Sequence, residues 1–243
     1  MLISPNMEKK TALITGGAKR IGCSIAELLA SKGYDIAIHY NHSKEDAEKL
    51  CGQLNEKGIT AKSYGCDLED MTAVSNLIKE ALNDVSSIDL LINNASVFEK
   101  DSIREINLDR IQQNLNVHYI APYILISEFA KITQKGHVIN ILDRHVDKGH
   151  TAFASYLISK KALKGLTDVA AAELAPDIRV NAIAPGFILD PEKQDQIDLE
   201  QRINKIPFKR KGAPIDIANT VAFLEETPYI TGQTLFVDGG ESL

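Results

Sequence analysis

Cysteine is scarce in this sequence, and tryptophan is absent from it. Cys23, Cys51 and Cys66 show neither a C-x-x-C spacing nor a nearby histidine placed as a metal ligand. They are typical of reduced intracellular thiols rather than of a disulfide framework or a zinc site. We therefore expect no metal and a cytoplasmic location.

Long apolar runs are also missing. No stretch approaches the roughly 20 apolar residues that span a bilayer, and the opening MLISPNMEKK has no apolar core of a signal peptide. The net charge of −6 provides no general attraction to nucleic acid or to anionic membranes. We expect neither partner, although a local basic pocket can still hold an anionic ligand.

Short apolar runs alternate with amphipathic segments along the whole chain. The 243 residues, 44% of them hydrophobic, are enough for one α/β domain spanning residues 1–243. Strands that alternate with helices predict a doubly wound parallel sheet with helices on both faces and right-handed crossovers. Strands are expected within 11–15, 34–43, 60–70, 88–98, 137–142 and 178–186, with a last one before the C-terminus.

A glycine loop follows the first predicted strand. TALIT is succeeded by GGAKRIG and then by an amphipathic helix, which is the opening of a dinucleotide-binding unit. Gly16, Gly17 and Gly22 allow close approach, and the helix N-terminus offers N–H groups to a pyrophosphate. Arg20 stands where many such loops have another glycine. The alternative is a tight strand-to-helix turn.

The second predicted strand ends in polar and aromatic residues: His39, Tyr40, Asn41, His42 and Ser43. NAD-selective sites usually place Asp or Glu there for the ribose 2′-hydroxyl. The lack of an acid, with Arg20 close by, favours NADPH. The alternative is a neutral turn before the helix predicted at 44–57.

Two further strand ends supply candidate contacts. Asp67 can accept from the adenine amino group, or alternatively cap the following helix. The strand at 88–98 breaks at NNAS, whose small residues let a nicotinamide ribose approach the backbone. Phe98, two positions after Ser96, can stack on a planar substrate; the alternative is a core residue.

Tyr156 and Lys160 lie four residues apart in a helix predicted over 154–175, so both side chains share one face. A nearby ammonium favours the phenolate and makes a tyrosine a workable acid and base. Asp143, thirteen residues before Tyr156, ends the strand HVINILD and is a candidate proton-relay partner.

The carboxyl ends of parallel strands meet at one edge of the sheet. That edge should hold Gly16, Asn41, Asp67, Asn94, Asp143 and Gly186. Residues 187–211 are polar and irregular and are interpreted as a substrate lid, or alternatively as a surface helix. Residues 108–131 predict a long helix in which Pro122 requires a local adjustment.

Together, TGGAKRIG, NNAS, D-x12-Y-x3-K, APG and ITGQTLFVDGG resemble the short-chain dehydrogenase/reductase family over the whole chain. The resemblance implies a Rossmann-type domain, a homotetramer or dimer, Tyr156 as proton donor and Lys160 on the nicotinamide ribose. With the strand-end argument, it assigns to the cofactor Gly16, Lys19, Arg20, Ile21, His39, Tyr40, Asn41, His42, Ser43, Asp67, Leu68, Asn94, Ala95, Ser96, Lys160, Pro185 and Gly186.

Departures from the family pattern narrow the resemblance. Asp143 stands where most members have serine, and His118 where many have an asparagine that serves a water relay. These features, with the arginine in the glycine loop, HYNHS and NNASxF, are similar to pteridine and dihydromonapterin reductases. That branch implies that Phe98 sandwiches a pterin, that Ser96 and Arg20 contact cofactor phosphate or pterin, and that Asp143 supports proton delivery by Tyr156.

The sequence thus predicts an NADPH-dependent reductase of dihydropterins, of the dihydromonapterin or dihydrobiopterin type, giving tetrahydropterins, with dihydrofolate as a candidate for a side activity. One alternative is a carbonyl reductase of another small substrate, whose usual serine is missing here. The other is a non-catalytic nucleotide-binding protein, which the intact Tyr156 and Lys160 disfavour.

Overall fold

Seven parallel strands form a single sheet in a computed structural model that describes residues 9–150, 152–189 and 196–243. Their order across the sheet is β3-β2-β1-β4-β5-β6-β7. The strands are β1 (Thr11–Ile14), β2 (Asp35–Tyr40), β3 (Ala61–Gly65), β4 (Leu90–Asn93), β5 (Gly136–Ile141), β6 (Ile178–Pro185) and β7 (Thr234–Val237). The chain changes direction across the sheet between β3 and β4, as the doubly wound prediction requires, and that prediction is confirmed.

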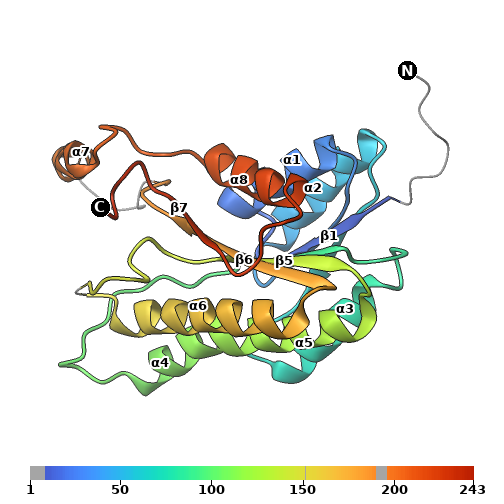
Figure 1. The fold of residues 1–243 in the computed structure, drawn as a ribbon, viewed down its shortest axis with the longest axis horizontal. Coiled ribbons are helices and arrows are strands. Elements are labelled where there is room, and N and C mark those ends of the chain that lie inside the picture. The colour runs from blue at the N-terminus through green and yellow to red at the C-terminus, as the bar shows by residue number, and fades with distance from the viewer. Residues whose placement is uncertain (1–8, 151, 190–195) are drawn as a thin grey trace.

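Helices cover both faces of the sheet (Figure 1). One face carries α1 (Arg20–Ser31), α2 (Lys44–Glu56) and α8 (Pro214–Glu226). The other carries α3 (Met71–Ala81), α4 (Leu108–Leu115), α5 (Ala121–Ile132) and α6 (Ala154–Leu174). A further helix, α7 (Gln196–Lys205), stands apart from these layers.

The central strands are buried on both sides, which is why their sequences are almost continuously apolar. Adjacent residues of a strand point to opposite faces. Leu13 and Leu91 accordingly pack in the cluster beneath α3, α5 and α6, whereas Ile14 and Ile92 pack in the cluster beneath α1, α2 and α8. Each such side chain contributes roughly 1.5–3 kcal/mol by leaving water, so the sheet is a rigid support for its loops.

The helix predicted at 108–131 is interrupted before its proline. A π-helical turn, Asn116–Ile120, lies between α4 and α5. Pro122 has no N–H to donate to the carbonyl of His118, so the regular hydrogen-bond ladder cannot continue through it. The predicted local adjustment is confirmed, and it places His118 in the turn.

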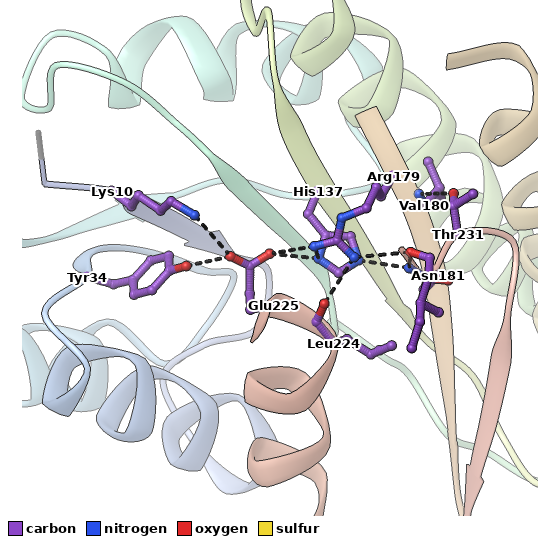
Figure 2. Close-up of polar contacts among 10 residues, drawn as sticks. Lys10, Tyr34, His137, Arg179, Val180, Asn181, Leu224, Glu225 and Thr231 are labelled. Atoms are coloured by element: carbon purple, nitrogen blue, oxygen red, sulfur yellow. Dashed lines mark hydrogen bonds and ion pairs between the residues drawn. The ribbon is translucent and has the colours of Figure 1, made fainter. Parts of the chain in front are cut away.

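A buried polar cluster closes the edge of the sheet where the strands begin (Figure 2). Glu225, at the end of α8, accepts hydrogen bonds from the Tyr34 hydroxyl at 2.5 Å and from His137 at 2.7 Å. Lys10 and Arg179 form ion pairs with it at 3.6 and 3.4 Å. Burial raises the pKa of Glu225, but the hydrogen bonds from His137 and Tyr34 outweigh this effect and lower it to about 2. The cluster therefore ties α8 to the strand beginnings.

Across residues 9–150, 152–189 and 196–243, no helix combines the length and the apolar character needed to cross a bilayer. The same part of the chain contains no group of three or more His, Cys, Asp or Glu side chains arranged to hold a metal ion.

Candidate active site

A cavity of about 1540 Å³ runs along the carboxyl edge of the sheet. Seven lysines and arginines line it against four aspartates and glutamates, so it is positively charged although the chain has a net charge of −6. Gly17 does not line it, but the catalytic, cofactor and substrate residues assigned from the sequence do: Gly16, Lys19, Arg20, Ile21, His39, Tyr40, Asn41, His42, Ser43, Asp67, Leu68, Asn94, Ala95, Ser96, Phe98, Asp143, Tyr156, Lys160, Pro185 and Gly186. Their individual roles stay predictions.

The glycine loop has the close packing that a dinucleotide site needs. Gly16 has φ +61°, and a Cβ there would meet Ala95 Cα at 2.9 Å. A Cβ on Gly22 would meet the Gly16 carbonyl oxygen at 2.3 Å. The Asn94 side chain donates to the carbonyls of Thr15 and Gly16, at 2.9 and 3.0 Å, and so fixes the loop from β4. The first turn of α1 has no side-chain cap, which leaves N–H groups for a phosphate. These residues fit a dinucleotide.

His39 supports this loop from the inside. Its Nδ1 accepts from the Gly16 N–H at 3.1 Å, and its Nε2 donates to the Cys66 carbonyl at 2.8 Å. Burial lowers the pKa of His39 to about 4, so the ring is neutral. Both ring nitrogens thus form hydrogen bonds with backbone groups. The exposed residues that follow β2 are Asn41 and His42.

Asp67 does not cap the helix that follows it, so that alternative is wrong. The cap of α3 is Asp70, whose side chain accepts from the N–H groups of Thr72 and Ala73. The Asp67 carboxylate accepts instead from the Glu69 N–H at 3.0 Å and from the Asn41 side chain at 3.5 Å. It therefore remains beside the end of β2, on the cavity wall.

Tyr156 and Asp143 meet as the sequence predicted. The phenol donates to Asp143 Oδ2 at 3.3 Å. Burial raises the pKa of Asp143, but two hydrogen bonds from His145 outweigh it, and the net shift is downward. The pKa of Tyr156 lies well above its ordinary value because the ring is buried and faces this carboxylate.

Lys160 does not make the tyrosine a phenolate in this structure. Its ammonium donates to the Ile141 carbonyl at 2.7 Å and lies 5.9 Å from the centre of the Tyr156 ring. Burial lowers the pKa of Lys160 to about 8, and Asp143 only partly opposes that shift. Burial and Asp143 dominate the pKa of Tyr156, so the phenol is a protonated acid here, and the effect of Lys160 on the phenol stays a prediction.

Phe98 belongs to an aromatic platform rather than to the core. Its side chain is 60% exposed, and its ring stacks on Phe153 with centroids 4.4 Å apart and planes 13° apart. The edge of Tyr156 contacts the same ring at 4.8 Å. Sequence reasoning missed Phe153, which precedes the first residue of α6. The pair presents a flat apolar surface beside the proton donor.

The comparisons with known proteins agree with this geometry. A family model described as enoyl-(acyl carrier protein) reductase matches residues 16–242. The chain belongs to the short-chain dehydrogenase/reductase family. The predicted resemblance to the family is confirmed.

Two solved structures and one curated relative are similar to the chain over nearly its whole length. The 3-oxoacyl-[acyl-carrier-protein] reductase of Staphylococcus epidermidis is 36% identical over 95% of this chain and 98% of its own. FolM alternative dihydrofolate reductase 1 of Brucella canis, solved with NADP, is 39% identical, with a TM-score of 0.92 and coverage of 97% of this chain and 94% of its own. A blue fluorescent protein from a metagenomic library, solved with NADPH, is 32% identical, with a TM-score of 0.91 and coverage of 96% and 98%.

In this short-chain reductase, His118 is buried below the cavity. Its Nδ1 lies 2.9 Å from the Ser159 hydroxyl. Its Nε2 accepts from the Val97 N–H at 3.1 Å and contacts the Ser96 hydroxyl at 3.0 Å. Burial first, and then the charge of Lys160, hold the pKa of His118 well below its ordinary value. The neutral ring therefore connects the segment that follows β4 to α6 through hydrogen bonds.

The C-terminus completes the wall near Asp143, which sequence reasoning also missed. Glu241 pairs with Arg144 at 2.9 Å and accepts from the Phe187 N–H at 3.0 Å. Arg202, from α7, lies on the Phe187 ring at 3.9 Å from its centre and also faces Glu241. Residues 190–195 of the predicted lid lie outside the described residues. The described part beyond them consists of the helix α7 and the irregular residues 206–211.

Proposed function

We propose that this reductase uses NADPH to convert dihydropterins, of the dihydromonapterin or dihydrobiopterin type and also dihydrofolate, to tetrahydropterins. The observation that carries the proposal is the hydrogen bond from Tyr156 to the carboxylate of Asp143. Because the pKa of Asp143 is lowered, that group is ionised at neutral pH. A carboxylate only accepts hydrogen bonds and repels a developing oxyanion. It therefore suits a ring nitrogen that must gain a proton better than a carbonyl oxygen.

Each residue has a definite part in the proposed reaction. NADPH, when bound, supplies the hydride for the carbon of the C=N bond. Tyr156 gives its phenolic proton to the nitrogen of that bond, and Asp143 holds the phenol in place. The Phe98–Phe153 pair supports the flat ring system. Lys160 carries the positive charge that orients the nicotinamide ribose.

The chain is an NADPH-dependent oxidoreductase, and the alternative of a non-catalytic nucleotide-binding protein is set aside. The Brucella canis neighbour was solved with NADP, and residues 40–43 here contain no carboxylate to repel a 2′-phosphate. The positive cavity also suits the phosphates. We assign the phosphate contacts to the glycine loop, to Arg20 and to the end of β2.

We also propose a homodimer or homotetramer. Ile103, Ile106 and Leu108 are 82%, 79% and 72% exposed beside the start of α4. Large apolar side chains gathered on one surface are typical of a contact between protein chains. Sedimentation of the purified protein tests the assembly.

A second candidate is a 3-oxoacyl reductase. The Staphylococcus epidermidis relative carries that name and matches nearly the whole chain. For this substrate, Asp143 stands where a neutral hydrogen-bond donor would serve the carbonyl oxygen better, and the stacked pair of the exposed Phe98 and Phe153 has no evident use. The pterin is therefore preferred.

The test measures NADPH oxidation by absorbance with dihydromonapterin, dihydrobiopterin and dihydrofolate, beside a 3-oxoacyl thioester and a panel of ketones, and again with NADH. We expect turnover of pterins with NADPH. In Asp143→Ser, pterin turnover should fall by about 100-fold, a usual loss for a proton-transfer group, while NADPH binding stays unchanged. Turnover confined to carbonyl compounds would contradict the proposal.

A further inference from the structure

The two oxygens of Asp143 face different partners. Oδ2 accepts from the Tyr156 phenol at 3.3 Å. Oδ1 accepts from the backbone N–H of His145 at 2.8 Å and from Nδ1 of its ring at 2.9 Å. The carboxylate thus bridges the proton donor and an imidazole in an unbroken chain of hydrogen bonds.

Lys160 and His118, the other polar side chains near Tyr156, form their hydrogen bonds with other partners. Lys160 donates to the Ile141 carbonyl. The ring nitrogens of His118 are engaged by Ser159 on one side and by Ser96 and Val97 on the other. His118 meets the Tyr156 ring only edge-on, with centroids 5.4 Å apart. Neither side chain bonds to the phenol oxygen, so neither restores its proton directly.

His145, in contrast, reaches the surface. Its side chain is 21% exposed, and its ring lies 4.4 Å from that of His150, which also lines the cavity. Histidine is the side chain that ordinarily gains and loses protons between about pH 5 and 8. A proton can therefore enter from water at this ring.

The charged side chains around the His145 ring do not block the entry of a proton from water. Arg144, the neighbour on the same loop, is paired with Glu241 at 2.9 Å. Arg202, on α7, faces Glu241 too, at 3.9 Å. Tyr156 and Lys160 approach from α6. Within the part of the chain that the structure describes, His145 is the one ionisable side chain besides Tyr156 that hydrogen-bonds to Asp143.

We propose that His145 is a positioning residue that fixes the Asp143 carboxylate and supplies through it the proton that Tyr156 loses in each turnover. The inference rests on the proposed reduction. Tyr156 O–H breaks as the substrate N–H forms. A proton then leaves Nδ1 of the His145 imidazolium for the carboxylate and passes to the phenolate oxygen, which restores the phenol. Water returns one proton to the imidazole, so each turnover consumes one proton from solvent.

The test compares His145→Asn with His145→Ala. The side-chain amide of asparagine places an N–H near the position of Nδ1 and keeps the hydrogen bond to Asp143, but it cannot release a proton. We expect kcat to fall at least 10-fold in both variants, with the Kd of NADPH unchanged. The pH profile of kcat should differ between the wild type and His145→Asn, because the asparagine side chain cannot release a proton to Asp143. Added imidazole should restore part of the kcat of His145→Asn.

The contrary outcomes distinguish the proton supply by His145 from the proposed function. A His145→Asn variant with the wild-type kcat and pH profile would overturn the proton supply, even if His145→Ala were impaired. Wild-type enzyme that reduces only 3-oxoacyl compounds would overturn the proposed function instead. The ratio of wild-type to His145→Asn turnover would still test His145 with that substrate.

Discussion

Gly16, in the glycine loop, and Arg20, the first residue of α1, both have left-handed backbone conformations, with φ +61° and +56°, but only the first is a glycine. A residue with a Cβ costs about 1–2 kcal/mol there. The Arg20 side chain also makes no hydrogen bond or ion pair with the described residues, and it is exposed on the cavity wall. A costly conformation without an internal partner points to a ligand.

Arg20→Gly should therefore stabilise the protein and weaken ligand binding. The relief of strain exceeds the added entropy of the unfolded chain, so the free energy of unfolding should rise by up to about 1 kcal/mol. The Kd for NADPH or the KM for the pterin should increase about 10-fold, as for loss of a charged hydrogen bond. Thermal unfolding and a fluorescence titration measure the two effects.

Lys209 provides the matched control. It has φ +53° and does not line the cavity. Lys209→Gly should give a similar gain in stability with no change in NADPH or pterin affinity. Equal effects of the two substitutions on binding would show that Arg20 has no ligand role.

Stability should decline in acid because several buried histidines are neutral. Burial lowers the pKa values of His39, to about 4, and of His118 and His137. The unfolded state then binds more protons below about pH 6.5, so the free energy of unfolding falls as pH falls. His39 alone should contribute a loss of roughly 2 kcal/mol between pH 7 and 5. Urea denaturation across this range measures the slope.

Burial is the main cause of the lowered pKa of His137, and one of its hydrogen bonds also opposes a second ring proton. Its Nε2 accepts from the Asn181 amide at 3.0 Å, and that amide is fixed because its oxygen accepts from the Gln233 N–H. A proton on Nε2 would face another donor. His137→Gln should therefore reduce the slope of stability against pH, whereas the exposed His42→Gln should leave it unchanged. The same slope in both variants would rule out His137 as a contributor.

The fold was predictable because the central strands of a doubly wound sheet are buried on both faces, so each of them is recognisable as a short apolar run. The carboxyl-edge rule then gathered Gly16, Asp143 and Gly186 without any knowledge of distances. The position of the helix break before Pro122 was also predictable, since it follows from one missing N–H.

Contacts between distant segments were not predictable. Phe153 meets Phe98, and Glu241 meets Arg144, only because separate loops converge at one end of the sheet. His145 is adjacent to Asp143 in sequence, but nothing in the pattern D-R-H shows that its ring turns back to the carboxylate. The protonated state of Tyr156 likewise depends on burial, which overrides the expected influence of Lys160.

Removal of the Phe98 ring should weaken substrate binding and leave the stability of the fold almost unchanged. Stacking of a base on an aromatic ring contributes about 1–3 kcal/mol, so Phe98→Ala should raise the KM for a dihydropterin about 10-fold. The ring is 60% exposed, and the melting temperature should change little. Phe223→Ala is the control, because that ring is 51% exposed on α8 and lies outside the cavity. Unchanged pterin kinetics in Phe98→Ala would remove the platform from the mechanism.

Activity should also fall in alkali, and Lys160 should set the midpoint. Its pKa is lowered to about 8 by burial, whereas that of Tyr156 is raised, so the phenol keeps its proton where the ammonium loses its own. Above pH 8, kcat/KM for NADPH should therefore decline because the charge that orients the ribose disappears. Lys160→Arg should lower the rate but abolish this decline, since a guanidinium stays charged to about pH 12. The exposed neighbour Lys161→Arg should keep the wild-type profile. An alkaline limb that persists in Lys160→Arg would assign the titration to another group.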